Sequence, residues 1–118
     1  MQKIRIALEV EVMPTATLRQ AKSSGKLELF RASWIADYPD AENYLSLFYS
    51  TNFSPNGPNY THYKNKAFDS LYRLAMANPK DSLRIQKDRD MYAMAMEQLP
   101  IIPLYYDEVL RFIQKGVK

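Results

Sequence analysis

The sequence of 118 residues contains no cysteine, which excludes disulfides and any site built on a thiolate. A single histidine, His62, excludes metal motifs that need two imidazoles. Only three glycines occur, and none forms a glycine-rich phosphate loop. No apolar run approaches the ~20 residues of a transmembrane helix. The sequence therefore predicts no metal site and no cofactor.

The excess of one charge over the other is also small, because 16 basic and 13 acidic side chains leave a net charge of +3. The basic residues are dispersed rather than clustered, so nucleic acid is not an expected partner. The sequence contains neither a nucleophile elbow around a serine nor residues at the spacing of a metal-binding motif. Asp37 and Asp40 resemble a carboxylate pair for glycoside cleavage, but nothing positions them. We therefore predict that the chain is not an enzyme.

The first third of the chain has the pattern of strands. Apolar residues alternate with polar ones over 3–13, which predicts a strand with one buried face. An apolar, aromatic-rich run at 27–35 predicts a second strand. A short helix through about Ser23, capped by Thr15 or Thr17, would join them as a βαβ crossover with a parallel pair.

The rest of the chain has mainly helical spacing. Asp40 is expected to cap a short helix, and longer helices are predicted at 65–77, capped by Asn65, and at 81–99. The predicted buried stripe of the last helix is Ile85, Tyr92, Ala95, Met96 and Leu99.

Two further apolar runs predict strands or edge segments, at 101–106 and 109–113. With 47% apolar and 25% charged residues, the composition is that of an ordinary globular protein. The expected fold class is α/β, a mixed, partly parallel sheet with packed helices in a single domain over 1–118.

Three sequence blocks occur in order: RASWIADYPDAENYL at 31–45, NYTHYKNKAFDSLYRLA at 59–75 and LPIIPLYYDEVLRFIQKGV at 99–117. Together they resemble the C-terminal portion of the family 5 extracellular solute-binding proteins, the oligopeptide- and dipeptide-binding components of ABC importers. Ser33 stands where that family usually has glycine, and Ala41 where it has proline. The resemblance implies part of one lobe of a type II periplasmic-binding-protein fold, so the chain would be a C-terminal lobe fragment of a larger two-lobed protein.

The resemblance also implies a small peptide ligand, permease subunits of an ABC transporter as partners, and a location in the periplasm or cell envelope, with or without a lipid anchor on the full-length parent. The start of the chain leads straight into strand-like sequence, so an export signal is expected to lie outside it. Strand faces cut from their neighbours predict dimerisation of the isolated fragment. Two alternatives stay open: a non-catalytic protein-interaction module, and a binding protein for a sugar or metal chelate.

Four residues are candidate ligand contacts: Arg31, Trp34, Asp37 and Tyr38. The resemblance matches Asp37 and Arg31 to ligand-contacting positions of the family. Asp37 would bind the ammonium of a peptide N-terminus through a charge-assisted hydrogen bond, and its alternative role is an Asx-turn. Trp34 would form a flat wall for peptide side chains, and its alternative role is that of a core aromatic residue. Arg31 would reach a ligand carboxylate, or else stay solvated or ion-paired. Tyr38 would line the pocket.

The surrounding polar and aromatic residues have simpler interpretations. Asn43 is expected to line or brace the pocket, and Tyr44 to join the core because it lies on a helical apolar stripe. Asp69 is expected on a helix surface, and His62 in a solvated loop. The tyrosines of the run at 101–106 are expected to be core residues.

Overall fold

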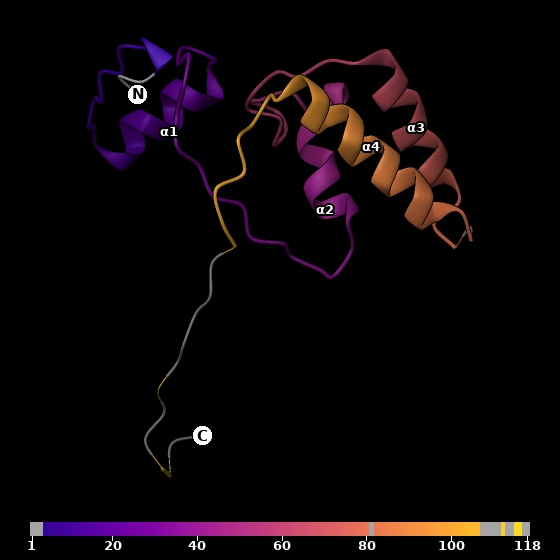
Figure 1. Ribbon diagram of the computed structural model, residues 1–118. Helices are drawn as coiled ribbons and strands as arrows, with labels where there is room; N and C mark the ends of the chain where they lie inside the picture. Colours follow the sequence, from indigo (N-terminus) through magenta and orange to yellow (C-terminus); the bar gives the residue numbers. More distant parts are fainter. Residues whose placement is uncertain (1–3, 81, 107–111, 113–114, 117–118) are drawn as a thin grey trace.

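The computed structural model describes residues 4–80, 82–106, 112 and 115–116. Its elements are the helices α1 (Thr15–Ser23) and α2 (Glu42–Leu45), the 3-10 turns η2 (Ser46–Phe48) and η3 (Ser50–Asn52), and the longer helices α3 (Lys66–Ala77) and α4 (Arg84–Gln98). Helices α2, α3 and α4 pack together as one helical unit (Figure 1). Helix α1 lies outside this unit (Figure 1), and Ser23 at its end accepts a hydrogen bond from Ser54 in the loop before α3.

The two long helices form where the sequence predicted them. Asn65 caps α3, because its Oδ1 accepts hydrogen bonds from the backbone N–H groups of Ala67 (2.9 Å) and Phe68 (3.2 Å). The predictions at 65–77 and 81–99 are therefore confirmed to within a few residues at each end.

The core lies between these helices and is rich in aromatic rings. Phe68 and Met91 are fully buried at its centre. The rings of Phe48, Tyr63 and Phe68 meet edge to face, with centroids 5.9, 6.0 and 6.2 Å apart. Such pairs stabilise a core beyond the area that they bury. The other buried apolar residues are Leu45, Tyr72, Ala75 and Ala95.

Asn59 organises the loop between η3 and α3. Its side chain is fully buried, and Nδ2 donates to the carbonyls of Tyr49 (3.1 Å) and Tyr63 (3.0 Å). Its Oδ1 accepts from the backbone N–H of Tyr63 and from the hydroxyl of Thr61, both at 3.2 Å. One side chain thus forms hydrogen bonds with several backbone groups of an irregular loop. Within this loop, Phe53 and Asn59 form an isolated β-bridge.

Helix α1 is confirmed, although its predicted cap is wrong. Pro14 is the N-cap residue, and neither Thr15 nor Thr17 caps the helix with its side chain. The helix stops before Gly25, which has a φ of 67°. A Cβ at this glycine would lie 3.1 Å from the ring of His62, so both its conformation and its contact favour glycine.

The predicted mixed sheet and α/β class are wrong for the part of the chain that the structure describes. Residues 6–14, 27–36 and 102–106 have no regular secondary structure there, so the βαβ crossover does not form. The predicted strand at 109–113 lies outside the described residues except for Phe112.

The absence of a partner strand within the described residues explains why the predicted strands do not form. A strand needs a second strand for its backbone N–H and C=O groups, and nothing within the described residues provides one for 6–14. Its apolar side chains stay exposed, from 52% for Ile6 to 91% for Val12. Tyr105 and Tyr106 are likewise 65% and 94% exposed, not core residues. Dimerisation through exposed strands is therefore unsupported.

The buried face of α4 also differs from the predicted stripe. Met91 and Ala95 are fully buried and Arg84 is 8% exposed, whereas three predicted core residues are more than half exposed: Ile85, Tyr92 and Leu99. Ala95 and Met96 were predicted correctly, since Ala95 is fully buried and Met96 packs partly buried against the core. The buried face also includes a charged residue, Arg84, which a search for apolar periodicity does not select.

Two side chains near α3 also differ from expectation. Tyr44 is 43% exposed rather than part of the core. Asp69 is buried rather than on the surface, and its carboxylate accepts hydrogen bonds from the N–H (3.1 Å) and hydroxyl (2.6 Å) of Ser50. Asp69 thereby fastens the start of η3 to α3.

Candidate ligand-binding segment

The four predicted ligand contacts lie on the irregular segment that leads into α2. Trp34 is fixed there by its polar edge, because its Nε1 donates to Oδ1 of Asn43 at 2.7 Å. Asn43 is buried, whereas Trp34 keeps 37% of its surface exposed. The indole is thus held in place and still offers part of its ring to a ligand.

Asp37 is exposed, and within the described residues its carboxylate has no hydrogen bond or ion pair. The alternative role in an Asx-turn is wrong, because the residue two positions on is Pro39, which has no N–H to donate. The Asx-turn of this segment belongs to Asp40, whose Oδ1 accepts from the N–H of Glu42 at 2.8 Å. Asp37 therefore remains available to a positively charged partner.

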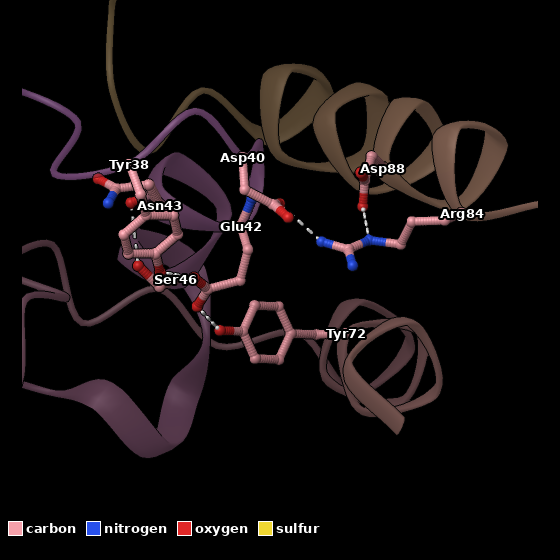
Figure 2. A network of polar contacts seen from close by, with 8 residues as sticks. All are labelled: Tyr38, Asp40, Glu42, Asn43, Ser46, Tyr72, Arg84 and Asp88. Atoms are coloured by element: carbon pink, nitrogen blue, oxygen red, sulfur yellow. Dashed lines mark hydrogen bonds and ion pairs between the residues drawn. The ribbon is translucent and has the colours of Figure 1, made fainter. Parts of the chain in front are cut away.

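Asp40 joins the segment to α4. Its Oδ1 contacts Nη2 of Arg84 at 2.8 Å, and Nε of Arg84 contacts Oδ1 of Asp88 at 3.0 Å (Figure 2). Burial lowers the pKa of Arg84, but the hydrogen bond and charge of Asp88, with the charge of Asp40, raise it above its ordinary value. The guanidinium stays charged and is paired on two sides, so Asp40 and Asp88 share its positive charge.

Glu42 joins the segment to α3. The hydroxyl of Tyr38 donates to Oε2 of Glu42, and the hydroxyl of Tyr72 donates to Oε1 (Figure 2). Burial, then the hydrogen bond to Glu42, raise the pKa of Tyr72 well above its ordinary value. The hydrogen bond to Glu42 raises the pKa of Tyr38 in the same direction. Both hydroxyls therefore remain protonated donors, and both carboxylate oxygens are in use.

Arg31 is turned to another part of the chain. Its Nη2 donates to the hydroxyl of Tyr105 at 2.6 Å, which joins the segment before α2 to the one after α4. Both side chains are exposed, so the contact leaves part of the guanidinium fork available. The contact between Arg31 and Tyr105 was not predicted from the sequence.

His62 makes more contacts than a solvated loop histidine would. Its side chain is exposed, but Nε2 lies 2.9 Å from the hydroxyl and 3.0 Å from the carbonyl oxygen of Ser54. Its ring also packs against Phe53, with centroids 5.0 Å apart. Among the described residues, no cluster of three histidine, aspartate or glutamate side chains could hold a metal ion.

The site includes three residues that sequence reasoning did not select: Glu42, Tyr72 and Arg84. Tyr38 and Glu42 are only four residues apart in the sequence, so their contact is local. This spacing is the only local signal. The contacts of Tyr72 with Glu42 and of Arg84 with Asp40 span 30 and 44 residues, and only the fold brings them together.

Several curated relatives of this chain are periplasmic binding proteins. The periplasmic oligopeptide-binding protein OppA of Salmonella typhimurium is 28% identical over 98% of this chain and 21% of its own length. The periplasmic murein peptide-binding protein MppA of Escherichia coli is 30% identical over 86% of this chain and 18% of its own length. The "Probable deoxycholate-binding periplasmic protein YgiS" of Escherichia coli is 28% identical over 92% of this chain and 19% of its own length.

These relatives confirm the resemblance to extracellular solute-binding proteins of the oligopeptide-binding type. All three relatives are named as periplasmic proteins, which agrees with the location expected from the sequence. The chain spans about a fifth of the length of the relatives that it matches. No protein-family profile and no solved structure matches it. None of the helices within the described residues is both long and apolar enough to span a membrane.

Proposed function

We propose that this chain is a segment of the substrate-binding component of an ABC importer, and that it contributes the side chains that bind the N-terminal end of a peptide. The oligopeptide- and murein peptide-binding names of two relatives support a peptide ligand. In this proposal the chain is the C-terminal lobe fragment of a two-lobed protein that delivers its ligand to permease subunits and catalyses no reaction.

One observation carries the assignment of the ammonium site. The short stretch 37–42 contains three carboxylates, and two of them are occupied by the fold: Asp40 by Arg84, and Glu42 by two tyrosine hydroxyls. Of these three carboxylates, only that of Asp37 has no hydrogen bond or ion pair within the described residues. A free carboxylate on an anchored segment is the group that a peptide ammonium needs, because a charge-assisted hydrogen bond is about twice as strong as a neutral one.

The neighbouring side chains fit accessory roles. Trp34, held by Asn43, would present its exposed ring face to the ligand's first side chains. Tyr38 would contribute its ring, which is 48% exposed, while its hydroxyl stays on Glu42. Arg31 would reach a ligand carboxylate with the donors that Tyr105 leaves free.

The isolated chain is not expected to bind peptides tightly. In this proposal the pocket is closed by a second lobe that the chain does not contain, and a ligand on one lobe stays largely hydrated. Calorimetric titration of the 118-residue chain with di- and tripeptides should therefore show no binding in the micromolar range. The assignment itself must be tested in the complete protein that carries the segment.

The test compares wild type with Asp37→Asn, using one peptide in free and N-acetylated forms. Removing the counter-charge of a bound ammonium is expected to weaken binding of the free peptide by about 2–5 kcal/mol. Asp90→Asn, an exposed aspartate on α4, is the matched control and should bind like wild type. Equal binding of the free peptide by Asp37→Asn and wild type would refute the ammonium site.

A second candidate ligand is a non-peptide solute, and the deoxycholate-binding name of one relative supports it. The same experiment separates the two candidates. If wild type binds the free and the acetylated peptide equally, or binds neither, the ammonium is not recognised and a non-peptide solute is the better assignment.

A further inference from the structure

Glu42 is one of the contacts between the candidate ligand segment and the helical unit. It lies in the first turn of α2, is partly buried, and accepts a hydrogen bond on each carboxylate oxygen (Figure 2). One donor, Tyr38, is the residue after Asp37. The other, Tyr72, is 7% exposed and belongs to the core side of α3. A single carboxylate thus connects the side chain of Tyr38, the residue after Asp37, to a core residue of α3.

The two hydrogen bonds that Glu42 accepts are of a strong type. Both hydrogen bonds join a hydroxyl to an ionised acceptor, and such bonds are roughly twice as strong as neutral ones. Tyr72 adds rigidity because its ring stacks on that of Tyr49, with centroids 4.4 Å apart. On the opposite side, Asp40 is held to α4 by Arg84. Positions 38 and 40 are therefore anchored to two different helices.

We propose that Glu42 is a positioning residue for ligand capture: by holding Tyr38 against α3, it fixes the direction in which the Asp37 carboxylate points. This inference rests on the proposed function. Glu42 does not contact the ligand itself, since both of its oxygens are occupied. Its effect is to order the segment during folding, so that binding does not have to order it.

Two nearly isosteric variants of the complete protein test the inference. Glu42→Gln keeps one acceptor oxygen and loses the other, and Tyr38→Phe removes one donor while keeping the ring. Each is expected to bind the free peptide about tenfold more weakly than wild type, because a segment that is no longer pre-organised must be ordered on binding. Glu97→Gln and Tyr44→Phe, both exposed, are the matched controls and should bind like wild type.

A cycle with Asp37→Asn distinguishes positioning from general destabilisation. If Glu42 acts through Asp37, Glu42→Gln should cost affinity in the wild-type background and almost none in the Asp37→Asn background. An equal loss in both backgrounds, or no loss in either variant relative to its control, would overturn the inference. Tyr38→Phe decides the case if Glu42→Gln fails to fold, since that tyrosine is 48% exposed.

The proposed function and this inference fail in different ways. If Asp37→Asn binds the free peptide like wild type, the ammonium site is absent and the inference falls with it. If Asp37→Asn weakens binding but Glu42→Gln and Tyr38→Phe do not, the ammonium site stands and only the positioning role of Glu42 is refuted.

Discussion

Replacing Asn59 by alanine should destabilise the helical unit more than any other single change in the loops. The variant loses the two donors and the acceptor that serve the carbonyls of Tyr49 and Tyr63 and the N–H of Tyr63. At a net value of about 1 kcal/mol for each hydrogen bond, the free energy of unfolding should fall by about 3 kcal/mol. Because Asn59 is fully buried, water does not replace these bonds without opening the loop.

The loss can be measured on the 118-residue chain by urea unfolding, followed by far-ultraviolet circular dichroism. A domain of this size is stable by about 5–15 kcal/mol, so the expected change should shift the midpoint clearly. Asn56→Ala is the matched control, because Asn56 lies in the same loop and is exposed. If the two variants unfold at the same urea concentration, Asn59 does not organise the loop and the argument is wrong.

Two further changes test the same region. Gly57→Ala should lower the melting temperature in differential scanning calorimetry, because a Cβ at Gly57 would lie 2.5 Å from the carbonyl oxygen of Asn52 and force the backbone to move. A melting temperature equal to that of wild type would refute this close approach. Asp69→Ala should lower the free energy of unfolding by about 2 kcal/mol, since it removes both acceptors of Ser50. Ser70→Ala, on the exposed side of α3, is its control, and an equal effect in urea unfolding would count against the role of Asp69.

The helices could be predicted because their determinants are local. The cap at Asn65, which the sequence predicted, and the buried residues Phe68, Tyr72 and Ala75 all lie within a dozen residues of one another. The predicted strand at 3–13 rested on alternation alone. Alternation states which side of a strand would be buried but does not supply the neighbouring strand, and the described residues contain none.

The buried face of α4 was predicted only in part, for a related reason. Apolar spacing identifies the buried side of a helix only when every buried residue is apolar. Arg84 is buried at the start of this helix because Asp40 and Asp88 neutralise it. Asp40 is 44 residues away, so no pattern within the helix reports the pairing. The prediction therefore missed Arg84 on the buried face, although it included Ala95.

The candidate site shows the same division between local and distant information. A sequence pattern can select a run of polar and aromatic residues, but it cannot say which of them the fold will occupy. Here Trp34 is held by Asn43, Tyr38 by Glu42, and Asp40 by Arg84. Asp37 lies between these anchored positions and is itself unpaired within the described residues. Anchors on both sides of one free carboxylate are the arrangement that a pre-organised charge site requires, because the group that binds must be the one that the fold positions but does not neutralise.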